Sequence, residues 1–135
     1  MSESSQNQSQ VLSLSHPQLV LLVEDDPGVR HVLARMLSRF AAVIEASGGL
    51  EALQLARKFR PTLIISDSAM PSGSGSDLVA ALKREPELAQ IPVILTSGYS
   101  VNHLSEMHSP APLFLQKPFT WEELNESIQV SLRVT

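Results

Sequence analysis

The sequence places five side chains that could handle phosphate or a metal ion at the ends of short apolar runs. They are Glu24 and Asp25 after "LVLLV", Asp67 after "TLIIS", Thr96 at the end of "PVILT", and Lys117 after "PLFLQ". An ionised carboxylate is costly to bury unless it is paired, hydrogen-bonded or bound to a metal. An apolar strand that runs directly into an aspartate therefore suggests that something binds there.

Together these groups fit a site for phosphoryl transfer. Carboxylates held close together raise one another's pKa unless a cation compensates, and carboxylate oxygens with open water positions suit Mg²⁺. A carboxylate beside Mg²⁺ and a lysine is well placed to attack a phosphoryl group and form an aspartyl-phosphate. We therefore expect Asp67 to lie exposed at the end of its strand, as the nucleophile.

Each of these residues has a plainer interpretation when it is taken alone. An acidic run such as Glu24–Asp26 commonly serves a helix N-terminus, and an aspartate such as Asp67 is often a turn residue. Lys117 alone could be a solvated surface lysine, and Thr96 alone could be an ordinary strand residue. Their joint placement at the ends of the apolar runs favours a common site.

The apolar runs alternate with segments in which apolar residues recur at intervals of three and four, the period of a helix. Strands are predicted at 19–23, 41–46, 62–66, 92–96 and 112–116, and a helix follows each of them. The predicted helix starts are Asp26 as N-cap before Pro27, Ser47 or a nearby glycine, Ser76 or Asp77, and a Thr120–Glu123 capping box. A shorter fourth helix is predicted to carry Val101, Leu104 and Met107.

Strands that read as unbroken apolar runs and alternate with helices predict an α/β fold with a doubly wound parallel sheet, buried on both faces. In such sheets, ligands bind beyond the carboxyl ends of the strands, near the point where the strand order reverses. Parallel strands end at the same edge, so the chemically active residues are expected to meet there.

The composition excludes several classes of function. The 135 residues fit one domain, which we place at 17–135 after a disordered Ser/Gln-rich tail or linker at 1–16. The absence of cysteine excludes a disulfide framework and a thiolate metal site, and the net charge of −4 does not indicate a nucleic-acid-binding surface. With no apolar stretch of membrane-spanning length and no signal peptide, we expect a cytoplasmic protein with no membrane partner. The histidines interpreted as surface residues are His16, His31, His103 and His108.

Several motifs in combination resemble the receiver domain of two-component response regulators, over about residues 18–133. They are "LLVEDD", "SDSAMP" with the Ser-Gly-rich turn and "SDLVAALK" after it, "VILTSG" and "FLQKPF". The resemblance implies a CheY-like, flavodoxin-like fold with five strands in the order 2-1-3-4-5 and five helices. It also implies a cytoplasmic phosphoacceptor that receives a phosphoryl group from a histidine kinase or a histidine phosphotransfer protein and acts on an unknown output partner. The chain is then no enzyme, beyond self-phosphorylation from small donors and slow autodephosphorylation.

The resemblance also implies a role for each matching residue. Asp67 matches the phospho-acceptor, and Asp25, Asp67 and the backbone carbonyl of Ala69 match the Mg²⁺ ligands, with Glu24 acting through water. The other implied roles are phosphoryl-oxygen binding by Thr96, charge pairing by Lys117, a switch aromatic at Phe114, and a cis peptide bond at Lys117–Pro118. If Thr96 moves inward on phosphorylation, Phe114 can turn into the vacated space and reshape the face of helix four, strand five and helix five.

Three positions depart from the common pattern of the family. Ser68 stands where an apolar residue is frequent, and Ala69 and Gly98 are small residues at positions that influence hydrolysis of the acyl-phosphate. The fourth predicted helix is interrupted by "SPAP", so the output face could be unusual.

Alternatives remain open at this point. The chain could be the C-terminal receiver of a hybrid histidine kinase, which the "SGYS…FLQKPF" region favours, or a stand-alone receiver. It could also be a pseudo-receiver that binds partners without phosphorylation, although every site residue is present. A haloacid-dehalogenase-like phosphatase is disfavoured, because the first strand is not followed by a D-x-D pair and the chain has no room for a cap insertion.

Overall fold

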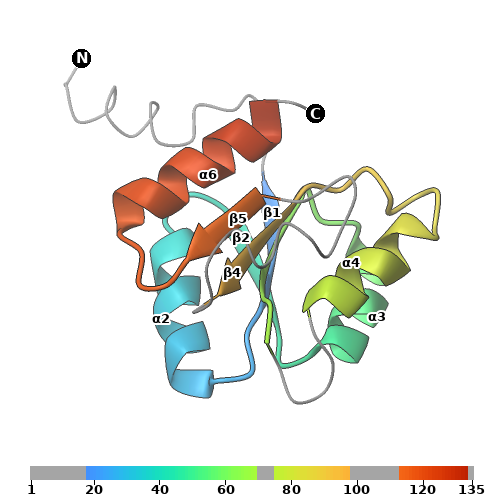
Figure 1. Ribbon diagram of the computed structural model, residues 1–135, viewed down its shortest axis with the longest axis horizontal. Coiled ribbons are helices and arrows are strands. Elements are labelled where there is room, and N and C mark those ends of the chain that lie inside the picture. Colours follow the sequence, from blue (N-terminus) through green and yellow to red (C-terminus); the bar gives the residue numbers. More distant parts are fainter. Residues whose placement is uncertain (1–17, 70–74, 98–112, 134–135) are drawn as a thin grey trace.

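The computed structural model describes residues 18–69, 75–97 and 113–133. These residues form one five-stranded parallel sheet with helices packed on both of its faces (Figure 1). The strands are β1 (Leu19–Val23), β2 (Ala42–Ala46), β3 (Leu63–Asp67), β4 (Val93–Ser97) and β5 (Leu113–Gln116). The helices are α2 (Pro27–Leu37), α3 (Gly49–Phe59), α4 (Gly75–Lys83) and α6 (Trp121–Arg133).

The strand order is β2-β1-β3-β4-β5, which confirms the predicted doubly wound parallel fold. The chain passes from β1 to β2 on one side and then crosses back to β3 on the other, so the order reverses between β1 and β3. In open α/β sheets this reversal marks the place where ligands bind. The third strand also extends one residue beyond the predicted range, and its last residue, Asp67, pairs in register with Thr96.

Two apolar layers hold the helices to the sheet. Helices α2 and α6 cover one face, and α3 and α4 cover the other (Figure 1). Successive side chains of a strand point to opposite faces, so in β1 Leu21 and Val23 pack with α3 and α4, while Val20 and Leu22 pack with α2 and α6. This double burial explains why the run "LVLLV" is apolar at every position.

The prediction that all five strands are buried on both faces is wrong for the two outer ones. All residues of β3 and β4 are buried, but β2 and β5 have no residue buried except Ala46. The strand order explains the difference, because an outer strand has a neighbour on one side only. The exposed position of Glu45 in β2 is tolerated for the same reason.

Side chains and backbone groups define where the helices begin. Asp26 caps α2 as predicted, since its Oδ1 accepts hydrogen bonds from the backbone N–H groups of Gly28 (2.8 Å) and Val29 (3.1 Å). The capping box of α6 is also confirmed. The Thr120 N–H donates to the Glu123 carboxylate (2.8 Å), and the Glu123 N–H donates to the Thr120 hydroxyl (3.1 Å).

The start of α3 agrees with the prediction from the sequence, and the start of α4 does not. Gly48 is the N-cap of α3, one of the predicted choices. Helix α4 begins at Gly75, so Ser76 and Asp77 lie inside its first turn and the prediction that one of them is the cap is wrong. The Gly75 N–H donates to the carbonyl of Ser68 (2.9 Å), which ties this helix directly to the end of β3.

Some predictions fall outside the described residues. They are the tail at 1–16, the fourth helix around Val101, Leu104 and Met107, the "SPAP" interruption, and Gly98. The part of the chain that the structure describes contains four of the five predicted helices. None of these described helices is long and apolar enough to cross a membrane.

Candidate functional site

The register of the sheet brings the predicted site residues to one edge. Val23 of β1 pairs with Ser66 of β3, so the residues that follow, Glu24 and Asp67, lie side by side. On the other side of β3, the backbone N–H of Lys117 donates to the backbone carbonyl of Ser97 in β4 (2.6 Å), which fixes the lysine just beyond β5. The C-terminal ends of β1, β3 and β5 therefore supply the charged groups of one site.

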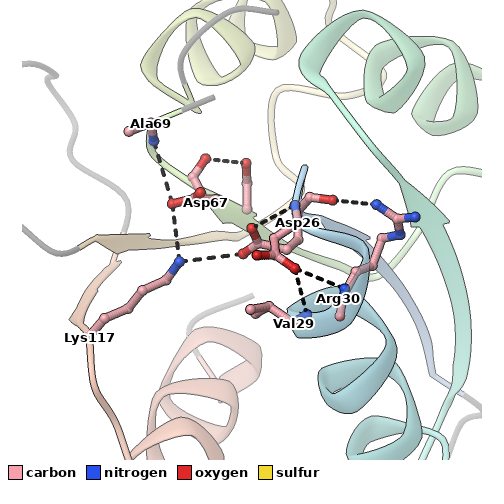
Figure 2. Close-up of polar contacts among 9 residues, drawn as sticks. Asp26, Val29, Arg30, Asp67, Ala69 and Lys117 are labelled. Carbon is pink, nitrogen blue, oxygen red and sulfur yellow. Dashed lines mark hydrogen bonds and ion pairs between the residues drawn. The ribbon is translucent and has the colours of Figure 1, made fainter. Parts of the chain in front are cut away.

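Lys117 places its ammonium group between two carboxylates (Figure 2). Its Nζ lies 3.4 Å from Glu24 Oε1 and 3.5 Å from Asp67 Oδ1. Both carboxylates are buried, with Glu24 only 3% exposed and Asp67 8% exposed. A buried charge needs a partner, and Lys117 provides one that is shared by the two strand ends.

The carboxylates form a group that could hold a metal ion. One oxygen each from Glu24, Asp25 and Asp67 lies within 4.8 Å of the others. This is an all-oxygen, anionic set, the chemistry that Mg²⁺ prefers, and Asp25 is only half-buried, which leaves a side open for water ligands. The residues therefore fit the expected Mg²⁺. The backbone N–H of Ala69 points to Asp67 Oδ1 at 3.5 Å, while a ligand role for the Ala69 carbonyl stays a prediction.

Asp67 is not exposed, contrary to the expectation from the sequence. It is the last residue of β3 and lies between β1 and β4, and the start of α4 packs on its main chain. A Cβ atom at Gly75 would lie only 2.7 Å from the Asp67 carbonyl oxygen. The neighbouring Ser68 is buried as well, and within the described part of the chain its hydroxyl has no hydrogen-bond partner.

The site raises the pKa of Glu24 above its ordinary value. Burial is the main cause, and repulsion from Asp67 and a hydrogen bond with Asp25 add to it. The backbone N–H of Asp26, which donates to Glu24 Oε2 at 3.2 Å, and the charge of Lys117 oppose the rise. Three carboxylates and one ammonium group thus leave a surplus of negative charge, which a divalent cation would relieve.

Sequence reasoning missed Arg30. This residue of α2 donates from Nη1 to the backbone carbonyl of Glu24 (2.7 Å) and from Nε to Glu45 Oε1 (3.3 Å). Its position five residues after Asp25, on the helix that directly follows the acidic pair, was the available signal. Which acceptors it reaches depends on how α2 lies against β2.

The two residues of the predicted switch occupy different faces of the sheet. Thr96 is buried and pairs with Asp67, whereas Phe114 pairs with Leu95 and packs with the apolar layer below α3 and α4. Their side chains therefore leave neighbouring strands in opposite directions. The Lys117–Pro118 peptide bond is cis, the isomer that the family resemblance implied. Of the histidines, His31 is described, and it is exposed on α2.

The five-stranded doubly wound sheet carries an acidic cluster and a lysine at its switch point, which is the arrangement of a receiver-type signalling domain. The chain belongs to the response regulator receiver domain family, whose sequence model matches residues 20–129. It is therefore a receiver domain of two-component signalling, in a family that works with histidine kinases.

The relatives include both long kinases and short regulators. A region of "Hybrid signal transduction histidine kinase D" from Dictyostelium discoideum is 32% identical over 108 residues, which covers 78% of this chain and 7% of the kinase. "Polar-differentiation response regulator DivK" from Brucella anthropi is 32% identical over 123 residues, 84% of this chain and 94% of that protein. The solved structure of CheY4 from Vibrio cholerae superimposes with a TM-score of 0.80 at 28% identity, covering 87% of this chain and all of that one (100%).

Proposed function

We propose that this receiver domain accepts a phosphoryl group on Asp67 from a phosphohistidine of a histidine kinase or a histidine phosphotransfer protein. The observation that carries the proposal is the placement of Asp67 beside Glu24, Asp25 and the Lys117 ammonium group, at the switch point of the sheet. A lone buried aspartate would repel an anionic phosphoryl group, and the positive charge of Lys117 beside Asp67 reduces that repulsion.

In the proposed reaction a carboxylate oxygen of Asp67 attacks phosphorus in line with the bond to the donor histidine. The P–N bond breaks, its electron pair stays on the histidine nitrogen, and an acyl-phosphate forms on Asp67. Lys117 neutralises part of the charge on the transferred oxygens. Glu24, Asp25 and Asp67, with the Ala69 carbonyl, would hold Mg²⁺, which supplies further positive charge when bound.

The signal would leave the site through Thr96 and Phe114. After transfer, the Thr96 hydroxyl would bind a phosphoryl oxygen, a role supported by the register pairing of Thr96 with Asp67. We propose that this shift reaches Phe114 through the pairing of β4 with β5, since the two side chains lie on opposite faces of the sheet, and alters the face formed by β5 and α6. If Thr96→Ala left partner binding fully dependent on phosphorylation, this route would be wrong.

We further propose that the chain turns over no substrate of its own beyond self-phosphorylation from small donors and slow autodephosphorylation. It would act in a phosphorelay or as a regulator in the cytoplasm, with an output partner that is a protein and not a nucleic acid. A role as the receiver of a hybrid histidine kinase is a second candidate, supported by the hybrid kinase among the relatives.

The test is intact-mass spectrometry after incubation with acetyl phosphate and Mg²⁺. The parent should gain one phosphoryl group, Asp67→Asn should gain none, and a chelator should abolish the gain. Asp77→Asn is the matched control, because Asp77 is an exposed aspartate in the first turn of α4. A gain that persists in Asp67→Asn would place the acceptor elsewhere. No gain, together with no Mg²⁺ binding, would instead support a pseudo-receiver that works by contact alone.

A further inference from the structure

Arg30 of α2 links the end of β1 to β2 beside the acidic cluster, and Figure 2 shows one of the contacts of its guanidinium group. Its Nη1 donates to the Glu24 carbonyl (2.7 Å), and its Nε pairs with Glu45 on the outer strand β2 (3.3 Å). The side chain is 22% exposed, so most of it lies against the protein. A planar guanidinium can serve two acceptors at fixed angles, which an ammonium group cannot do.

The carbonyl of Glu24 depends on this contact. The last register pairs of β1 are Val23 with Ala46 and Val23 with Ser66, so Glu24 lies one residue beyond the ladder on both sides. The Glu24 backbone N–H still donates to the Ala46 carbonyl (3.0 Å). Among the described residues, the Glu24 carbonyl receives no backbone hydrogen bond from β2 or β3. A buried carbonyl needs a donor, and Arg30 supplies it from the following helix.

This hydrogen bond fixes the peptide that joins Glu24 to Asp25. The two neighbouring carboxylates belong to the metal-binding group, and the direction of each depends on the rotation of that peptide. Asp26, the next residue, is already fixed as the N-cap of α2. The Glu24–Asp25 peptide lies between the end of β1 and the start of α2, and the hydrogen bond from Arg30 restrains its rotation.

We propose that Arg30 is a positioning residue that holds the acidic pair in the geometry needed to bind a divalent cation. It contacts the main chain of the acidic pair, and its pairing with Glu45 keeps the guanidinium in place. The inference rests on the proposed function, because it assumes that Mg²⁺ binds to the cluster. It adds a residue outside the acidic cluster, on α2, to the machinery of the site.

The experiment measures Mg²⁺ affinity of the full chain by calorimetric titration. Arg30→Met keeps the apolar stem and removes both contacts, and Mg²⁺ affinity is expected to fall by about tenfold or more, as for other groups that orient metal ligands. Arg30→Lys should recover part of that loss, since an ammonium group can reach one acceptor. Glu45→Gln should have a smaller effect than Arg30→Met, because it leaves the bond to the Glu24 carbonyl possible.

Two controls separate positioning from general stability. Arg57→Met removes an arginine that pairs with Glu85 at a distance from the site, and Leu82→Ala opens a cavity in the core under α4. Both should keep the Mg²⁺ affinity of the parent, even where urea unfolding shows a loss of stability. In phosphorylation with acetyl phosphate, Arg30→Met should raise the Mg²⁺ concentration needed for half-maximal rate and approach the parent rate at saturation.

The inference is overturned if Arg30→Met binds Mg²⁺ within about twofold of the parent, or if Leu82→Ala loses as much affinity, because the effect then follows stability alone. These results would leave the proposed function intact as long as the parent binds Mg²⁺ and is phosphorylated. A parent that binds no Mg²⁺ would remove the proposed metal site, and the inference with it.

Discussion

At the residue scale, the site depends on one ammonium group that compensates two buried carboxylates. Lys117 lies 3.4 Å from Glu24 and 3.5 Å from Asp67, and its charge lowers a Glu24 pKa that burial raises. A carboxyl whose pKa is raised by folding destabilises the protein as pH rises through that range, because the folded state binds more protons. The metal-free protein is therefore expected to carry electrostatic strain at neutral pH.

Removing the ammonium group should expose this strain. In Lys117→Met the pKa of Glu24 rises further, so the metal-free variant should melt at a lower temperature than the parent at neutral pH, and the difference should shrink on acidification. A cation that binds only the folded state stabilises it by mass action. Mg²⁺ should consequently raise the melting temperature of the variant more than that of the parent, as measured by thermal unfolding with and without the ion.

Lys58→Met is the matched control for Lys117→Met. Lys58 is exposed at the end of α3, with its Nζ 5.2 Å from the ring centre of Phe59, and it lies in no contact with the acidic group. Its substitution should leave the response to Mg²⁺ unchanged. Equal Mg²⁺-induced shifts in the parent and in Lys117→Met would show that the lysine does not compensate the carboxylates.

At the element scale, the approach of α4 to the end of β3 requires a glycine. A Cβ at Gly75 would lie 2.7 Å from the Asp67 carbonyl oxygen and 3.0 Å from the Ser68 Cα, and both are main-chain atoms that cannot turn aside. Gly49 also lies in the first turn of a helix, α3, but a Cβ there meets nothing within 4 Å. The two glycines form a natural pair for comparison.

Gly75→Ala should destabilise the protein by about 1–3 kcal/mol, the usual range for inserting a methyl group into a packed region. Gly49→Ala should be neutral or stabilise it by up to about 1 kcal/mol, because alanine restricts the unfolded chain. Urea unfolding of both variants gives the two free energies. If both substitutions change stability equally, the packing of α4 against β3 is looser than described.

At the scale of the whole molecule, ion pairs connect α3 to the turn that follows α4. The Arg57 guanidinium forms a two-pronged contact with the Glu85 carboxylate, with a shortest distance of 2.7 Å, and Arg60 pairs with Glu87 in the same turn. The contact with Arg57 lowers the pKa of Glu85. Since these groups are exposed, water and salt screen the attraction.

A lowered carboxyl pKa stabilises the fold above the unfolded pKa, and this contribution is lost as pH falls through the folded pKa. Glu85→Gln should therefore melt slightly below the parent at neutral pH, and the two melting curves should converge at acidic pH and at high salt. Arg57→Gln and the double variant complete the cycle. A difference that persists in acid or in salt would point to packing, and not to the ion pair, as the cause.

Much of the architecture was predictable because it depends on local periodicity. Apolar runs of strand length and the caps at Asp26 and Thr120 follow from the side chains nearby in sequence. The burial of Asp67 and the start of α4 at Gly75 were not predictable in this way. Both depend on how α4 packs against the end of β3. That packing brings Gly75 against Asp67 and Ser68, and no local sequence pattern indicates this contact.

The sequence by itself determined the class of fold, the strand ends that carry Glu24, Asp25, Asp67 and Lys117, and the family, because residue type and spacing are enough to place each group at its strand end. Only the tertiary structure decided how these groups share charge and which other residue supports them. Lys117 is 93 residues from Glu24 along the chain, and Arg30 reaches Glu45 only because α2 packs beside β2. Distances of this kind depend on register and packing between elements, which a linear pattern does not contain.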